Sequence, residues 1–88
     1  MIGVQGPSTV KLYPNPTHDR FVIDLFSNES KEVLIGLFDR SGRLVRQQKV
    51  YALAGRNTIP WDLDNFAPGI YFLSFEGLGL RNIKIVKE

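Results

Sequence analysis

The chain is a succession of short segments in which apolar and polar residues alternate, separated by turns containing glycine, proline or asparagine. These segments recur about every 10 to 12 residues, which is the spacing of a β-sandwich or a small barrel. No window keeps the helical period of apolar residues for longer than one turn. The sequence therefore predicts an all-β, antiparallel domain of about seven strands, at residues 9–13, 20–26, 32–39, 43–51, 58–62, 69–76 and 80–86.

The alternation also predicts where each strand lies in a sheet. Residues 20–26 place Phe21, Ile23 and Leu25 on one face. Residues 32–39 are apolar on both faces, which predicts a central strand covered on at least part of its second side. Residues 43–51 become polar in the middle, which favours an edge position. Because proline cannot donate to a ladder, Pro60 predicts an edge or a bulge for the strand at 58–62.

Four segments without strand alternation lie before or between these strands. Tyr13-Pro14-Asn15-Pro16 predicts a stiff, extended entry, because each proline fixes its own φ and restricts the residue before it. Asp39-Arg40-Ser41-Gly42 predicts a hairpin built on a type I turn and closed by a left-handed glycine. Residues 63–69 predict a loop with at most one tight helical turn, and residues 77–79 predict the last hairpin. In the closing strand we expect Ile83 and Ile85 to face the core, and Lys84 and Lys87 to face water.

Composition excludes several classes of protein. The 88 residues, 43% of them hydrophobic, suit one globular domain rather than a disordered chain. The net charge of +2 is dispersed, which argues against nucleic acid as a partner. No segment reaches the roughly 20 apolar residues of a membrane-spanning helix. Residues 1–6 lack the features of a secretory signal, so Met1 is interpreted as the start of an expressed fragment and residues 1–8 as a flexible linker or its remnant.

No catalytic, metal-binding or cofactor-binding residue is predicted. The absence of cysteine removes thiolate chemistry, and the single histidine, His18, lies in a polar turn and is interpreted as a surface residue. Asp62, Asp64 and Asn65 resemble part of a calcium loop but lack its further ligands, so we interpret them as turn caps. We therefore expect a protein that is not an enzyme and binds no cofactor.

Two aromatic residues leave an alternative open. Trp61 and Tyr71 could form a stacking platform for a sugar, although such side chains more often pack in a core. Core packing is favoured for Trp61, and Tyr71 is undecided. An Ig-like accessory module that binds carbohydrate or protein is therefore the alternative function, and a structural spacer or a subunit that dimerises through a sheet edge is a further one.

Several short motifs, in order, resemble one family. They are Tyr13-Pro14-Asn15-Pro16, Phe38-Asp39, Gly42-Arg43-Leu44-Val45, Gly55 with Asn57, Pro68 to Leu73, and Lys84-Ile85-Val86-Lys87. Each motif alone is weak, but together they resemble the C-terminal sorting domain of the type IX secretion system, which belongs to Bacteroidota. The resemblance covers nearly the whole chain from Val10 to Glu88, so that residues 9–88 would be the sorting domain.

The resemblance implies an Ig-like β-sandwich at the C-terminal end of a secreted cargo protein. It implies an upstream cargo domain, an outer-membrane translocon that reads the domain in the periplasm, and a surface sortase-like peptidase that removes it from many cargos. The cargo would then reach the cell surface or the extracellular space. Cleavage is expected in the linker, in the region of Gly3, Gly6 and Ser8.

For recognition by the translocon, we hypothesise that the folded sandwich presents its last strand. Asp39 and Gly42 would set the hairpin, and Gly69 and Tyr71 would order the penultimate strand. The last strand would offer backbone and charge to a partner that adds a strand at its free edge. The residues assigned to this last role are Arg81, Lys84, Ile85, Val86 and Lys87.

Overall fold

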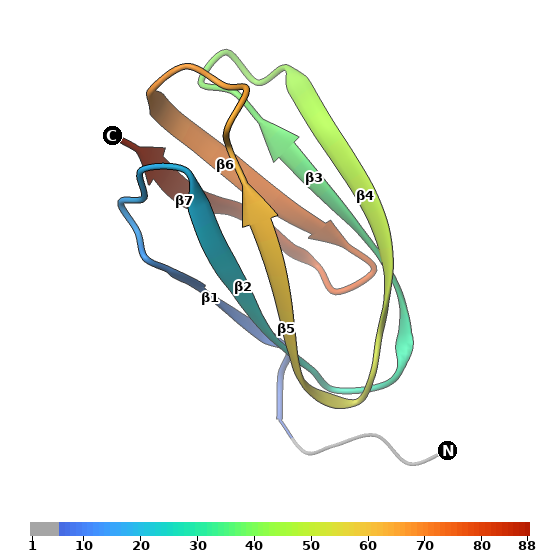
Figure 1. The fold of residues 1–88 in the computed structure, drawn as a ribbon. Coiled ribbons are helices and arrows are strands. Elements are labelled where there is room, and N and C mark those ends of the chain that lie inside the picture. The colour runs from blue at the N-terminus through green and yellow to red at the C-terminus, as the bar shows by residue number, and fades with distance from the viewer. Residues whose placement is uncertain (1–5) are drawn as a thin grey trace.

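The structure, a computed structural model, describes residues 6–88 and forms seven β-strands (Figure 1). They are β1 (Thr9–Tyr13), β2 (Arg20–Ser27), β3 (Lys31–Phe38), β4 (Leu44–Ala52), β5 (Gly55–Asp62), β6 (Gly69–Glu76) and β7 (Leu80–Lys87).

The strands form two antiparallel sheets that face each other (Figure 1). One sheet has three strands in the order β1-β2-β5, and the other has four in the order β4-β3-β6-β7. As in the immunoglobulin sandwich, the first, second and fifth strands share one sheet and the third, sixth and seventh share the other; here the fourth strand pairs with the third instead of joining the sheet of the first. The prediction of an all-β, Ig-like antiparallel sandwich of about seven strands is therefore confirmed.

The core lies between the sheets and follows the two-residue period of the strands. Phe21, Ile23 and Leu25 of β2 are at most 2% exposed, as predicted. They meet the inward residues of the opposite sheet, which include Val33, Ile35, Leu37, Leu73, Phe75 and Ile85, each 0% exposed.

The central strand is β3, which pairs with β4 on one side and β6 on the other. Its second face is covered only in part, and by side chains of the same sheet. A Cβ atom added at Gly36 would lie 3.1 Å from Ser74 Oγ and 3.2 Å from a ring carbon of Phe38, with Leu44 also close. The Phe38 ring therefore lies over the glycine, and this outer face carries no further layer within residues 6–88.

The predicted edge strands and turns are largely confirmed. Both β4 and β5 are edge strands, and Pro60 is exposed on β5. The strand β5 begins at Gly55, three residues before the predicted start, because Arg56 and Asn57 also pair with β2. The loop at 63–69 contains a single turn, in which the Phe66 amide donates to the Leu63 carbonyl (3.0 Å).

The register of β7 changes at a bulge. Leu73 faces Ile83, but Phe75 faces Leu80, so the last strand carries one extra residue. Asn82 takes up the change with a left-handed φ of 59°, a conformation that asparagine tolerates better than most residues. Because of the bulge, both Leu80 and Ile83 pack against the core.

Candidate recognition surface at the last strand

The outer edge of β7 is occupied near the C-terminus by the segment Asn15–Thr17, here called the edge cap. Asn15 Nδ2 donates to the Lys84 carbonyl (2.8 Å), and Asn15 Oδ1 accepts from the Val86 amide (3.0 Å). The Thr17 amide donates to the Val86 carbonyl (2.8 Å), and the Glu88 amide donates to the Thr17 carbonyl (2.9 Å). Figure 1 shows this loop, between β1 and β2, beside the end of β7.

The expectation of a free terminal edge is therefore wrong for the stretch from Lys84 to Glu88. Four backbone groups that point away from β6 there, namely the Lys84 carbonyl, the Val86 amide and carbonyl and the Glu88 amide, are already bonded to the edge cap. The Pro-Asn-Pro motif is therefore not the extended entry expected from the sequence: it lies in a bent connection between β1 and β2, with cis peptide bonds before both prolines, and it covers an edge that could otherwise pair with another chain. A partner that adds a strand at this stretch must first displace the edge cap.

The asparagine of the edge cap yields a prediction. Asn15→Ala removes a donor and an acceptor from the edge of β7, and we expect the free energy of unfolding to fall by about 1 kcal/mol. Hydrogen exchange at the Val86 amide should accelerate, since that amide loses its acceptor. Asn65→Ala, at an exposed loop asparagine, is the matched control. Unchanged protection of Val86 in Asn15→Ala would contradict this role.

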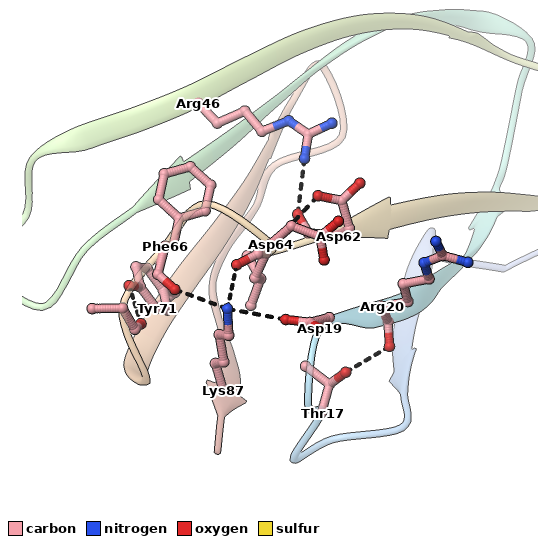
Figure 2. Close-up of polar contacts among 11 residues, drawn as sticks. Thr17, Asp19, Arg20, Arg46, Asp62, Asp64, Phe66, Tyr71 and Lys87 are labelled. Atoms are coloured by element: carbon pink, nitrogen blue, oxygen red, sulfur yellow. Dashed lines mark hydrogen bonds and ion pairs between the residues drawn. The ribbon is translucent and has the colours of Figure 1, made fainter.

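Lys87 points inward, which corrects the expectation that it faces water. Its side chain is 9% exposed, and Nζ donates to the carbonyls of Leu63 (2.7 Å) and Phe66 (2.9 Å). It also lies 3.1 Å from Oδ1 of Asp19 (Figure 2). The physical reason is the strand period: Lys87 lies two residues after Ile85 and therefore on the same, inward face.

The hairpin at Asp39–Gly42 forms as predicted. The Gly42 amide donates to the Asp39 carbonyl (2.9 Å), and Gly42 has a φ of 89°. The Asp39 carboxylate accepts from the Ser41 hydroxyl (2.6 Å), and from the amides of Ser41 (2.9 Å) and Arg43 (3.0 Å). The hydrogen bond from the Ser41 hydroxyl, followed by the one from the Arg43 amide, lowers the pKa of Asp39 below its ordinary value of 3.8.

The lowered pKa of Asp39 gives a pH dependence. A carboxylate with a depressed pKa in the folded state stabilises the fold above its unfolded pKa, and that contribution is lost as the pH falls through the folded value. We expect wild-type stability to fall more steeply below about pH 3.8 than that of Asp39→Asn, which has no charge to lose. Denaturant titrations near pH 5 and pH 3 measure this difference, and parallel curves for the two proteins would contradict it.

Tyr71 and Trp61 are both core residues, so they offer no stacking platform for a sugar. Tyr71 is 7% exposed, and its hydroxyl donates to the Ala67 carbonyl (2.5 Å), a tyrosine corner near the start of β6. Trp61 is 3% exposed; its Nε1 donates to Gln48 Oε1 (2.8 Å), and the Arg46 guanidinium lies 4.3 Å from its ring centroid. The two polar residues come from the inward face of β4.

The structure brings some predicted recognition residues together and separates others. A groove of about 680 Å³ runs over the outer face of β3, β6 and β7. It is lined by residues of the β3–β4 hairpin, among them Asp39 and Gly42, and by Arg81 of β7. Lys84 and Val86 lie on the same outer face, whereas Tyr71, Ile85 and Lys87 point inward. Gly69, at the start of β6, is paired with Lys87 outside this groove.

The predicted cleavage region lies at the N-terminal end. Gly3 is outside the described residues. Gly6 is exposed, and Ser8 is half-buried with its Oγ accepting from the Asn28 amide (3.0 Å). Of these positions, Ser8 is therefore already attached to the sandwich.

Other candidate sites have structural explanations. His18 is exposed, and the Asp62 carboxylate accepts from the Asp64 amide (3.3 Å), as a turn cap does. Within residues 6–88, no group of three or more His, Cys, Asp or Glu side chains could hold a metal ion. No helix in the same part of the chain is long and apolar enough to cross a membrane.

Sequence reasoning missed the edge cap and the inward lysine. For Lys87 a signal was present, because its spacing from Ile83 and Ile85 is even. For Asn15 and Thr17 no local pattern indicates a partner, since their contacts with β7 span about 70 positions.

The opposed sheets and the tyrosine corner define an Ig-like β-sandwich module. The chain belongs to the family of secretion system C-terminal sorting domains, whose model matches residues 11–88. Domains of this family are signals for type IX secretion and not catalytic modules, and cargo that carries them is exported to the cell surface or outside.

Among solved structures, dimeric latent PorU from Porphyromonas gingivalis has a similar fold, with a TM-score of 0.69 and 23% sequence identity. The similarity covers 96% of this chain but 10% of the PorU chain, so it concerns one small part of that protein. At this identity the likeness shows the fold alone. Among curated proteins, no matching sequence was found.

Proposed function

We propose that the outer-membrane translocon reads this sorting domain in its folded state, after an upstream cargo domain has reached the periplasm. The residues proposed to carry recognition are Asp39, Gly42, Gly69, Tyr71, Arg81, Lys84, Ile85, Val86 and Lys87. The observation that supports this proposal is the match of the family to residues 11–88, which includes the whole of β7. Gly69, Tyr71, Ile85 and Lys87 act indirectly in this proposal, by holding β6 and β7 in place.

A surface sortase-like peptidase then removes the domain by cutting in the region of Gly3, Gly6 and Ser8. The attachment of Ser8 to Asn28 favours a cut on its N-terminal side, where Gly6 and Pro7 are exposed. Mass spectrometry of the domain released into the medium identifies the new N-terminus. A cut after Thr9 would contradict this placement.

The experiment that tests the tail is a reporter fused to residues 6–88, with and without Lys84 to Glu88. We expect the truncated fusion to accumulate in the periplasm. Because truncation also removes the buried Ile85, a Phe75→Ala fusion serves as a control that weakens the core and keeps the tail. Normal export of the truncated fusion would exclude a terminal signal, and equal loss of export in both variants would assign the effect to folding alone.

Pairing of two copies through a sheet edge stays a prediction. The edge cap leaves only part of the β7 edge available for pairing with a second copy. The outer edge of β4, at the other side of the same sheet, is therefore the better candidate for such pairing. Sedimentation of the domain over a range of concentrations tests it, and a constant monomer mass would contradict it.

A further inference from the structure

The edge cap restricts how a partner can reach the last strand. From the Lys84 carbonyl to the Glu88 amide, the outward backbone groups are bonded to Asn15 and Thr17. The side chains on the outer face are not restricted in this way: Lys84 is exposed and Val86 is half-buried. What a partner meets at the end of the chain is therefore a sheet face rather than an open strand.

That face has an apolar floor. Phe38 and Phe72 face each other across β3 and β6, point away from the core and line the groove of about 680 Å³. Both are half-buried, although no other layer covers them within residues 6–88. An apolar, hollowed surface that the domain leaves uncovered is typical of a site for another protein.

The rim of the groove is basic. Arg40 and Arg81 line it, and Lys84 is the cross-strand neighbour of Phe72 on the same face. All three are exposed and have no ion pair in the described part of the chain. Glu76 also lines the groove and has no cationic partner in the described part of the chain. This face therefore carries three unpaired cations and one unpaired carboxylate.

We propose that the outer face of β3, β6 and β7, with Phe72 at its centre and Arg81 and Lys84 on its rim, is the surface by which the export machinery holds this domain. Its partner is a protein surface with apolar side chains in the middle and carboxylates around them. This inference rests on the proposed function and adds to it the place and the chemistry of recognition.

The shape and charge of the face favour a protein over an anionic lipid surface. The aromatic rings form the floor of a hollow rather than a protruding wedge, so a flat bilayer would leave them uncovered. Juxtamembrane lipid recognition usually takes clusters of about four to eight cations, whereas this rim has three.

The test uses the reporter fused to residues 6–88 and two pairs of matched variants. Arg81→Glu with Lys84→Glu reverses charge on the rim, and Lys11→Glu with Arg20→Glu makes the same change in net charge on the three-stranded sheet. Phe72→Thr removes the floor, and Phe26→Thr makes the same change at an outward, half-buried position of β2. Each variant is first shown to melt within a few degrees of the unmodified fusion.

We expect both groove variants to lower the exported fraction at least tenfold, which corresponds to about 1.4 kcal/mol of lost binding. Both control variants should stay within twofold of the unmodified fusion. A photo-crosslinking residue at position 72 should label a protein of the export machinery, whereas the same residue at position 26 should not.

Three results would overturn the inference. The first is export of folded groove variants at the unmodified rate. The second is an equal loss in the controls. The third is binding of the fusion to phosphatidylglycerol vesicles that the groove variants abolish, since it would assign the face to lipid. In each case the unmodified fusion is still exported; if that fusion itself stays in the periplasm, the proposed function fails instead.

Discussion

Phe75→Ala is expected to lower the free energy of unfolding by about 3–5 kcal/mol, the usual cost of removing a large aromatic side chain from a core. Phe75 is 0% exposed and lies on β6 between Ile35 of β3 and Leu80 of β7. Its removal leaves a cavity among residues of one sheet and their partners in the other. For a domain of this size, the loss is a large part of the total stability.

Chemical denaturation measures this effect, with Phe72→Ala as the matched control on the same strand. Phe72 lies three residues away, points outward and is half-buried, so its truncation removes less buried area and leaves no enclosed cavity. An effect of Phe75→Ala no larger than that of Phe72→Ala would contradict the placement of the core.

Lys87→Met is expected to cost about 2–4 kcal/mol. The change keeps the apolar stem but removes the ammonium that donates to the carbonyls of Leu63 (2.7 Å) and Phe66 (2.9 Å). Hydrogen bonds from a charged group contribute about 1.5–3 kcal/mol each, and the carbonyls lose their donor. The ion pair with Asp19 adds little, because that carboxylate is 52% exposed.

Lys84→Met is the control for this change, since Lys84 lies on the same strand with its side chain on the exposed face. We expect it to shift the free energy of unfolding by less than about 0.5 kcal/mol. Equal effects of the two substitutions would show that Lys87 does not anchor the 63–66 loop to β7.

The strands could be predicted from the sequence because their signal is local. The alternation of Phe21, Ile23 and Leu25 follows from the pleat of a single strand, and the Asp39–Gly42 turn is formed by its own side chains. The sequence does not predict the burial of Tyr71 in a tyrosine corner, because the acceptor of its hydroxyl is a loop carbonyl whose position depends on the whole fold.

The candidate surface could be predicted only in part. The sequence indicates Arg81 and Lys84, but their place beside Phe38 and Phe72 on one sheet face depends on the pairing of β3, β6 and β7. Lys87 was assigned to water because it is charged, although its spacing from Ile85 favours the inward face. The carbonyls that stabilise it there come from a loop more than 20 positions away.

The central claim is that this domain is a signal that other machinery handles. The most direct measurement fuses a periplasmic reporter to residues 6–88 and follows it in a bacterium with type IX secretion and in an otherwise identical strain without the translocon. We predict reporter at the surface or in the medium of the first strain, and in the periplasm of the second. Reporter retained in the periplasm of the first strain, or found outside the second, would contradict the account.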